Sequence, residues 1–582
     1  MKKIFLSEKG ILPNTDITAA LCELFSKEKN DTEFIFESGD YYFSPQNALK
    51  LDYNLSNTEH IPYRTLGILL KDMKNCVING NGARLWFEGQ MQPFTLDCCE
   101  NLTVRGFSIN WRYPLVAEAV VLSHTEMSAT LYIDPQMFPH RYSDVWLEFY
   151  VGAGEWYPMF THHQIYDDES RCILQDTGDR FRVLSVSETG AGDGIFRFDL
   201  KRKVDIKDGS IVVLRHNARV HSGIFAEKCR ELVFEDINIY SCGGIGCLAQ
   251  FCHDLTYRRI NFLPDSSLGR AISSGRDDGI HLTSNSGTLT VTESTFFGLM
   301  DDPINVHGCC VMAKELISDS SVRCRYGHDD ANNFRYWAEK GDEVVFINKK
   351  NMAPVAKARV ASYELESPEC FVLELDSHID DKVKALISED GIAVDNLSHT
   401  AEFICTKNRF GNCRARGILV SVPKRVLIED NYFETSGSAI LMAGDSNYWY
   451  ESGACRNVEI RNNIFTSKCL SAVFQFGEGV ISICPTIPEP DISLPYHENV
   501  YIHDNIFDTA DTTVLYAFSC DSLEFSGNRI FKSPSRKWWN RRDALVSLDT
   551  CRNARVVGND VIGSFELRGL DAKDCVDVES DM

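Results

Sequence analysis

Short apolar strands of one pattern recur along this chain at a spacing close to 23 residues. The apolar residues that close these strands lie 23 positions apart in three places: Ile239 and Phe262, Phe410 and Phe433, and Phe507 and Ile530. The gaps from 433 to 465 and from 465 to 507 are longer, 32 and 42 residues, as loops inserted at one corner would make them. A repeat of this length with short strands indicates a solenoid in which each repeat forms one turn. Helical periodicity is nearly absent, so we expect an all-β protein built as a parallel β-helix.

The first residues and a set of asparagines fit the same solenoid. A helical pattern over residues 16–25, capped by Asp16 or Thr15, is expected to cover the open edge of the first turn. Six asparagines share one phase of the repeat, two positions before its closing apolar residue. We expect their side chains to form a ladder that hydrogen-bonds from turn to turn. They are Asn408, Asn431, Asn463, Asn505, Asn528 and Asn559.

The repeat is interrupted twice. Residues 112–215 and 311–398 lack its phase and show alternating strands with Gly-Asp or Asp-Gly turns, enough for a small antiparallel barrel or sandwich in each. We therefore divide the chain into an N-terminal part of the β-helix with its cap, a first inserted module, middle turns that carry the aspartates discussed below, a second inserted module, a C-terminal part of the β-helix and a frayed acidic tail. The boundaries are 1–111, 112–215, 216–310, 311–398, 399–566 and 567–582.

Charge and cysteine content narrow the choice of partners and compartment. The 582 residues include 59 Lys and Arg against 83 Asp and Glu, a net charge of −24, which argues against nucleic acid and anionic membranes as partners. No apolar run is long enough for a transmembrane helix. The 21 cysteines are an odd number with adjacent pairs at 98–99 and 309–310, so we expect free thiols. Glu8 and Lys9 interrupt the opening Met-Lys-Lys-Ile-Phe-Leu, which predicts a cytoplasmic protein, or a secreted or periplasmic one if a signal has been removed.

Two adjacent aspartate pairs are separated by one turn of the solenoid. Asp278 lies 23 positions before Asp301 and 24 before Asp302. Equivalent positions of successive turns stack at about 4.8 Å, so the three carboxylates are expected to share one patch. Because neighbouring residues of a strand face opposite sides, Asp301 and Asp302 can share that patch only at a turn or bulge. Clustered acids fit general acid and base catalysis, a divalent-cation site or a plain surface turn, and the spacing leaves all three open.

Other metal and cofactor motifs are missing from the sequence. Cys242, Cys247 and Cys252 lack the spacing of a tetrahedral zinc site and are expected to be inward-facing thiols. The chain contains no P-loop, HExxH or GxSxG motif. Apart from the divalent-cation alternative at the aspartates, we expect neither a bound metal nor a cofactor.

The residues around these aspartates resemble a known family. Gly275–His281 (Gly-Arg-Asp-Asp-Gly-Ile-His) and Met300–Gly308 (Met-Asp-Asp-Pro-Ile-Asn-Val-His-Gly), with the paired insertions and the N-terminal capping helix, are similar to glycoside hydrolase family 110 among the pectinase-like right-handed parallel β-helices. The resemblance covers essentially the whole chain. It implies an α-1,3-galactosidase that removes terminal α-galactose from oligosaccharides such as blood group B glycans, with inversion of the anomeric centre. Polygalacturonases share the Asp…Asp-Asp arrangement, but the Gly-His-Gly and Arg-Ile-Lys that normally follow it are missing here.

The resemblance also implies roles for individual residues. Asp301 would be the general acid that protonates the glycosidic oxygen, and Asp278 and Asp302 would activate water. One turn is shorter than the separation of about 6.5–9.5 Å that is typical of inverting carboxylates, so inversion rests on the resemblance alone. Contacts with the substrate are expected from the polar neighbours and from one aromatic ring that could stack on a sugar: Arg276, Asp277, His281, Asn305, His307 and Trp449.

Three other functions remain open. A polysaccharide lyase would hold Ca²⁺ with the same aspartates to acidify a uronate proton, with Arg276 as the nearest base. A polygalacturonase-like hydrolase would use the same carboxylates on another sugar, and a non-catalytic carbohydrate-binding β-helix would make the cluster incidental. A homodimer is compatible with the sequence, and the choice between branched and linear glycans is left open.

Overall fold

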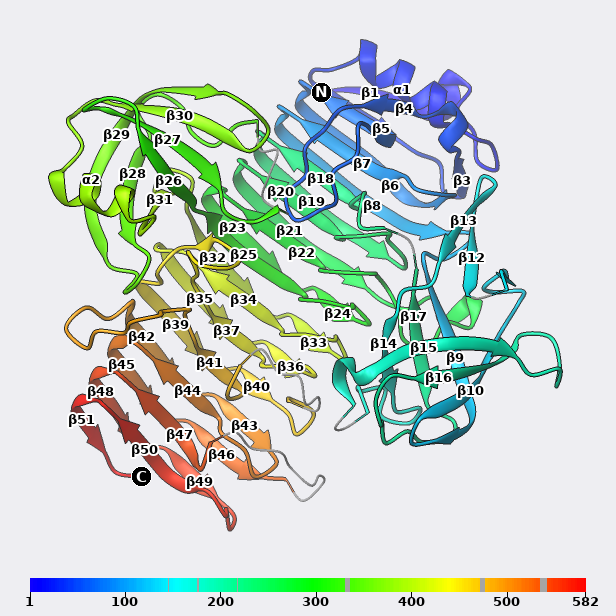
Figure 1. The fold of residues 1–582 in the computed structure, drawn as a ribbon. Coiled ribbons are helices and arrows are strands. Elements are labelled where there is room, and N and C mark those ends of the chain that lie inside the picture. The colour runs from blue at the N-terminus through cyan, green and yellow to red at the C-terminus, as the bar shows by residue number, and fades with distance from the viewer. Residues whose placement is uncertain (145, 175–176, 217, 330–334, 471–476, 534–541) are drawn as a thin grey trace.

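The main body of the protein is a parallel β-helix that runs the whole length of the chain (Figure 1). The computed structural model describes residues 1–582 except 145, 175–176, 217, 330–334, 471–476 and 534–541. Within the described residues, one sheet contains 22 strands, from β1 (Lys2–Phe5) to β51 (Val576–Ser580), and a second contains 14. Almost all neighbouring strands in both sheets are parallel, which confirms the predicted all-β parallel β-helix.

The pairing between turns confirms the 23-residue repeat. Ile239 of β19 (Arg230–Ile239) pairs with Phe262 of β21 (His253–Phe262). The other two predicted pairs, Phe410 with Phe433 and Phe507 with Ile530, are also register partners. Several of these phenyl rings stack inside the β-helix, with centroids 4.7 Å apart for Phe410 and Phe433. A buried aromatic column at one phase of the repeat explains why the closing apolar residue marks each turn.

The asparagine ladder is present as predicted. The backbone N–H of Asn431 donates to Oδ1 of Asn463 at 2.9 Å, and the N–H of Asn463 donates to Oδ1 of Asn505 at 2.9 Å. The same contact links the other members from Asn408 to Asn559. Each amide therefore satisfies a buried backbone group of the preceding turn at the bend between strands.

The 14-stranded sheet carries the candidate site on its outer face. Its short strands lie one per turn, and β38 (Glu451–Ser452) pairs antiparallel with the end of β25. The others are β4 (Leu49–Leu51), β5 (Arg64–Lys71), β7 (Gln92–Asp97), β18 (Ile224–Glu227), β20 (Cys247–Gln250), β22 (Ile280–Thr283), β25 (Ile304–Cys309), β34 (Ile418–Ser421), β37 (Ile440–Met442), β41 (Ile481–Ile483), β44 (Leu515–Phe518), β47 (Ala544–Asp549) and β50 (Arg568–Lys573).

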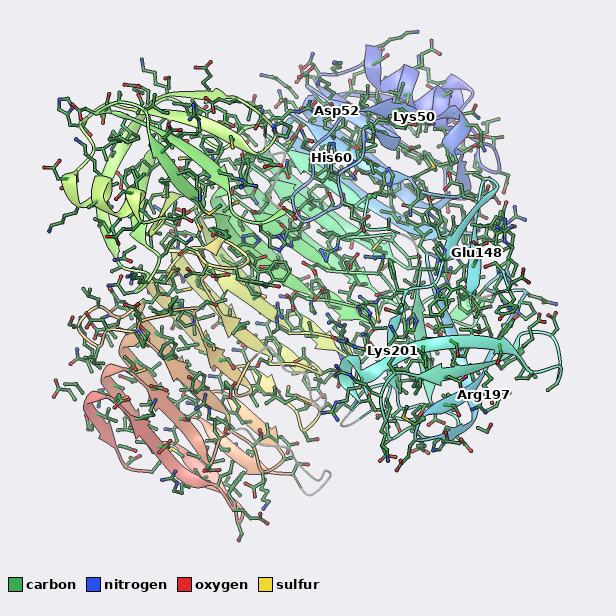
Figure 2. The ribbon with its side chains drawn as sticks, viewed as in Figure 1. Lys50, Asp52, His60, Glu148, Arg197 and Lys201 are labelled. Atoms are coloured by element: carbon green, nitrogen blue, oxygen red, sulfur yellow. The ribbon has the colours of Figure 1, made fainter. Side chains whose placement is uncertain are left out.

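Two closed antiparallel barrels of six strands lie to either side of the middle turns in Figure 1. The first consists of β9 (Val116–Thr125), β10 (Ser128–Ile133), β14 (His162–Tyr166), β15 (Phe181–Glu188), β16 (Ile195–Leu200) and β17 (Ile211–Arg215), beside a small sheet of β11 (His140–Tyr142), β12 (Leu147–Gly152) and β13 (Glu155–Pro158). Its side chains Arg197 and Lys201 are exposed (Figure 2). The second consists of β26 (Val311–Leu316), β27 (Ser321–Tyr326), β28 (Glu343–Asn348), β29 (Pro354–Leu365), β30 (Cys370–Leu375) and β31 (Ile392–Asn396), with helix α2 (Asp381–Ser388).

The two ends of the β-helix differ in part from expectation. Helix α1 (Thr18–Lys27) begins two residues later than predicted, after Asp16 Oδ1 accepts the N–H of Thr18 at 2.9 Å. The expectation of a frayed tail from residue 567 is wrong. Strand β50 pairs with β47, and β51 pairs with β48 (Arg552–Val557), so the tail adds a last turn to both sheets. Leu570 and Val578 explain this, because they pack partly buried against the core.

The cysteines have the expected state. All 21 are free thiols, and Cys242, Cys247 and Cys252 are fully buried in the core. Among the helices in the described part of the chain, none has the length and apolar character that crossing a membrane requires.

Candidate active site

Three aspartate carboxylates converge at the start of two neighbouring strands. Asp278 lies just before β22, whereas Asp301 and Asp302 lie in a bend between β24 (Thr295–Phe297) and β25. Because Ile280 pairs with Ile304, Asp278 stands beside Asp302 of the next turn. One carboxylate oxygen of each aspartate lies within 4.8 Å of those of the other two. The structure thus brings together the three aspartates that the spacing singled out, at an irregular point of the chain as expected.

Two arginines of the following turn bind these carboxylates. Arg416 donates its backbone N–H to Asp302 Oδ1 at 2.9 Å and its guanidinium to Oδ2 at 2.7 Å. Arg414 donates to Asp301 Oδ1 at 3.4 Å. The same guanidinium makes a bidentate contact, at 2.9 and 2.5 Å, with Asp179 of the first barrel. The first barrel therefore holds Arg414 in place beside the aspartates.

Burial raises the pKa of two of the three carboxyl groups, Asp278 and Asp302, and so favours their neutral forms. Asp278 and Asp302 are 5% and 2% exposed. Burial, and after it the negative charge of Asp301, raises the pKa of Asp278 well above its ordinary value. Burial also raises the pKa of Asp302 to about 7, although Arg416 opposes this change. The side chain of Asp301 is more open, at 23% exposed, so it is the most accessible of the three.

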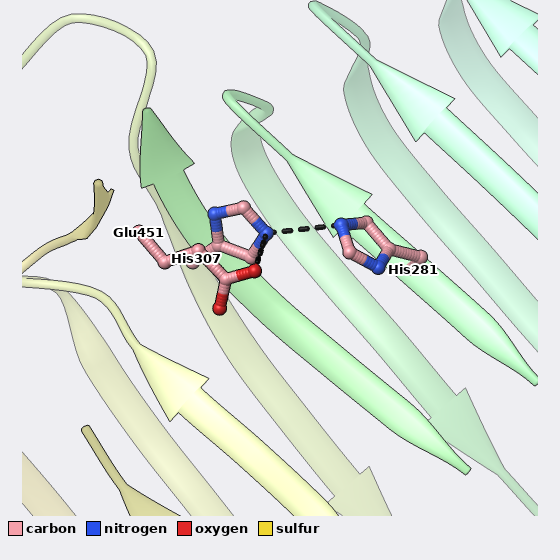
Figure 3. A group of neighbouring side chains, drawn as sticks. All are labelled: His281, His307 and Glu451. Carbon is pink, nitrogen blue, oxygen red and sulfur yellow. Dashed lines mark hydrogen bonds and ion pairs between the residues drawn. The ribbon is translucent and has the colours of Figure 1, made fainter. Parts of the chain in front are cut away.

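A row of contacts leads from Asp278 to Glu451, and Figure 3 shows its last three members. His281 Nδ1 lies 2.7 Å from Asp278 Oδ2, and its Nε2 lies 2.9 Å from Nε2 of His307. Nδ1 of His307 donates to the carbonyl oxygen of Gly308 at 2.6 Å, and its Nε2 lies 3.5 Å from Glu451 Oε1. Burial lowers the pKa of His281 to about 4 and also lowers the pKa of His307, so both rings are neutral at neutral pH.

The second barrel supports the Glu451 end of this row. Strand β38 brings Glu451 to the sheet because Ser452 pairs with Gly308 at the end of β25. The hydroxyl of Ser452 also donates to Asp395 of β31 at 2.7 Å. Burial would raise the pKa of Glu451, but His307 and His281, which are protonated in the acidic range where Glu451 titrates, together with Arg416 outweigh it and lower that pKa. Glu451 is therefore an ionised carboxylate beside two neutral histidines.

A pocket of about 510 Å³ opens above these residues, within the usual range of small-molecule sites, about 300–1,000 Å³. Its wall carries charged and amide groups together with apolar side chains and one large indole ring. Trp449, which is 48% exposed, lies at this wall. The lining residues include Asn57, Arg219, Asp278, Asp301, Asp302, Asn305, Arg414, Arg416, Leu419, Leu441, Trp449 and Glu451.

The remaining residues predicted to bind substrate fall into two groups. Asn305 and Trp449 line the pocket, and His281 and His307 lie beneath it in contact with Asp278 and Glu451. Arg276 and Asp277 are buried and do not form part of the described pocket wall. Arg276 donates to Asp277 at 2.7 Å and lies over the ring of Phe160. The arginines Arg219 and Arg276 lower the pKa of Asp277 although burial alone would raise it, so Asp277 is an ionised anchor for both.

Among the described residues, two clusters each bring three side-chain atoms that could bind a metal within 4.8 Å of one another. They are Asp278 with Asp301 and Asp302, and His281 with His307 and Glu451. In the first cluster, guanidinium groups already supply the positive charge beside Asp301 and Asp302. In the second, the two histidine nitrogens are at hydrogen-bond distance and satisfy each other through a proton. In both clusters, charges or hydrogen bonds of the protein itself thus already compensate the donor atoms.

Several pocket residues were missed from the sequence. Arg414 and Arg416 lie 113 and 114 positions after the aspartates that they bind, because the second barrel intervenes. Without the 88 residues of 311–398, 114 becomes 26, close to one turn, and this signal was available in the sequence. Asn57 comes from the segment between β4 and β5, which also holds Asp52 and His60 (Figure 2). Asn57 and Arg219 reach the pocket from irregular segments and Glu451 from the two-residue strand β38, and none of the three carries a periodic signal.

Comparison with known proteins identifies the family. The chain is 34% identical over 574 residues to an α-1,3-galactosidase B of Bacteroides thetaiotaomicron, which covers 97% of this chain and 91% of that protein. It is 31% identical to an α-1,3-galactosidase B of Phocaeicola vulgatus, over 96% and 94% of the two chains. No protein-family model matches. Among solved structures, the A-module of a mannuronan C-5 epimerase from Azotobacter vinelandii aligns with 99% of both chains at 9% identity and a TM-score of 0.35. The two close relatives show that this chain belongs to the α-1,3-galactosidases, glycoside hydrolase family 110, and is a glycosidase.

Proposed function

We propose that this glycosidase removes terminal α-1,3-linked galactose from oligosaccharides such as blood group B glycans, by a single displacement with inversion and without a metal. The observation that carries the proposal is the cluster of Asp278, Asp301 and Asp302 at a sugar-sized pocket. Carboxyl groups in different environments supply the acid and the base that glycoside hydrolysis requires. The relatives named as α-1,3-galactosidases support the choice of galactose and of its linkage.

Asp301 is proposed as the general acid, and Asp278 and Asp302 as the pair that activates water. The partial exposure of Asp301 supports its role, because the acid must reach the glycosidic oxygen. The pKa of about 7 for Asp302 supports a base, since a base works best with a pKa near the working pH. We propose that the sugar site is shaped by Arg414, Arg416, Asn305, Trp449, His281 and His307. Arg276 and Asp277 lie behind the pocket wall, where Asp277 holds the pocket residue Arg219 in place.

Inversion is the part of the proposal that spacing does not support. The closest oxygens of the three carboxylates lie within 4.8 Å, nearer to the roughly 5–5.5 Å of retaining enzymes than to the roughly 6.5–9.5 Å of inverting ones. Burial favours the neutral forms of Asp278 and Asp302, and because a nucleophile and a general base must both be ionised, their pKa values do not choose between the two mechanisms. The anomer of the released galactose decides between the two mechanisms.

The rival functions have less support. A lyase would place Ca²⁺ at the aspartates, but two guanidinium groups next to Asp301 and Asp302 would repel it. Arg276, the nearest base for such a reaction, is paired with Asp277 behind the pocket. A purely binding protein would gain nothing from placing three acids together with two of them buried. The net charge of −24 argues against nucleic acid and anionic membranes as partners. A homodimer would give twice the chain mass in light scattering.

The test uses a trisaccharide that ends in α-1,3-linked galactose, with and without EDTA. We expect galactose release that EDTA does not reduce, and a loss of about 10²–10⁴-fold in Asp301→Asn. Asp381→Asn is the matched control, because Asp381 also belongs to an adjacent aspartate pair and its side chain is 99% exposed on α2. Full activity of Asp301→Asn would contradict the acid role. Loss of activity in EDTA, with unsaturated products from a uronate polymer, would support the lyase instead.

A further inference from the structure

The row of contacts from Asp278 to Glu451 has one proton arrangement that fits two neutral histidine rings. Nδ1 of His307 faces the carbonyl oxygen of Gly308. A carbonyl oxygen only accepts, so Nδ1 of His307 carries a hydrogen and its Nε2 accepts. Across the 2.9 Å contact, Nε2 of His281 must then donate, which leaves Nδ1 of His281 as an acceptor. The 2.7 Å contact between that Nδ1 and Asp278 Oδ2 therefore takes its hydrogen from Asp278. Asp278 is a neutral carboxylic acid in the resting site.

The same contacts permit a second arrangement with the same number of protons. The hydrogen of Asp278 Oδ2 moves to Nδ1 of His281, and the hydrogen on Nε2 of His281 moves to Nε2 of His307. Asp278 is then a carboxylate, His281 is again neutral, and His307 is an imidazolium that still donates to Gly308. The positive ring faces Glu451 Oε1 at 3.5 Å. Two short proton shifts thus separate the two arrangements, and no group has to leave the row.

The charged groups around the row bear on both arrangements. Asp278 faces the carboxyls of Asp301 and Asp277 and the guanidinium of Arg219, and like charges nearby favour its neutral form. His307 faces Glu451, and Asp395 of the second barrel lies near enough to interact with it. These carboxylates favour a proton on His307. At one end of the row the surroundings therefore favour a neutral Asp278, and at the other end they stabilise a protonated His307.

We propose that Asp278, His281, His307 and Glu451 form a proton relay, in which the proton held by Asp278 passes through His281 to His307 beside Glu451 when Asp278 has to act as a base. The proposal rests on the proposed function, because a base that activates water must first be ionised. His281 and His307 are positioning residues that act through Asp278. Glu451 supplies the counter-charge, and the relay gives the second barrel, which supports Glu451, a part in the reaction.

The first test replaces His307 by Gln, whose amide can accept from His281 but cannot take up the proton. We expect the acidic limb of the kcat/KM profile to move about one unit to higher pH, with kcat lower by about tenfold below that limb and KM nearly unchanged. His124→Gln, at an exposed histidine paired with Asp208 in the first barrel, is the matched control and should leave the profile unchanged. A profile of His307→Gln that coincides with that of the wild type would overturn the proposal.

The second test uses the wild-type protein, so it depends neither on the folding of a variant nor on enzyme activity. Nitrogen-15 NMR of the histidine-labelled wild-type protein at neutral pH should give His281 with its hydrogen on Nε2 and His307 with its hydrogen on Nδ1. Both rings with hydrogen on Nδ1, or one equivalent of divalent metal that survives dialysis against a chelator, would overturn the relay, since a cation would then replace the proton between the rings. Galactose release by the same sample separates a failure of the relay from a failure of the proposed function.

Discussion

Replacement of Arg416 by Gln should move the pH dependence of the reaction by an amount that the structure allows us to calculate. The variant keeps the backbone N–H on Asp302 Oδ1 and loses the guanidinium contact of 2.7 Å, between side chains that are 14% and 3% exposed. A buried hydrogen bond to a charged group contributes about 1.5–3 kcal/mol, and one pKa unit corresponds to about 1.36 kcal/mol. Removal of the cation favours the neutral carboxyl, so the pKa of Asp302 should rise from about 7 by about one to two units.

The assay is the pH profile of kcat/KM on an α-1,3-galactosyl disaccharide, which reports ionisation of the free enzyme. Because the proposed base must be ionised, activity should fall as the pH drops through about 7 in the wild type, and at a higher pH in Arg416→Gln. Arg325→Gln, at an exposed ion pair with Glu369 in the second barrel, is the control and should not move the limb. An acidic limb at the same pH in Arg416→Gln and the wild type would refute the reasoning that Asp302 is the limiting base.

The remaining predictions concern the acid and the frame that holds the site. Asp301→Asn should lose less activity on galactosides with an acidic phenol as leaving group than on natural glycans, because such a leaving group needs no proton; an equal loss on both would contradict the acid role. Asn463→Ala should lower the free energy of unfolding by about 3 kcal/mol, since it leaves a buried backbone N–H and carbonyl unpaired, and Asn457→Ala at an exposed asparagine should not. Glu118→Ala removes the acceptor of three backbone N–H groups in residues 271–273, at 2.7–2.9 Å, and should lower kcat together with the melting temperature; wild-type values for both would contradict a bracing role for the first barrel.

The repetitive part of the fold could be predicted because each turn repeats the same packing. Phe410 and Phe433 occupy one column of the core, and Asn431 and Asn463 occupy one bend, so their spacing in the sequence equals one turn of the chain. The last turn was missed because the acidic residues around Asp571 concealed the apolar side chains of Leu570 and Val578 that pack against the core.

The site could be predicted where it follows the same period and not elsewhere. Asp278 and Asp302 are register neighbours, so their separation of 24 residues was sufficient to bring them together. Arg416 obeys the same register, since Ile304 pairs with Ile418, but an inserted barrel conceals the period. Glu451 comes from a strand that pairs antiparallel with the end of β25, a contact that no repeat specifies.

Time-resolved proton NMR of a trisaccharide ending in α-1,3-linked galactose, mixed with the enzyme in the presence of EDTA, tests the single displacement through the anomer of its product. We expect that galactose is released and that the β-anomer accumulates first, before mutarotation produces the α-anomer. Release of the α-anomer first would contradict the single displacement by Asp278, Asp301 and Asp302, and the absence of galactose release would contradict the proposed function itself.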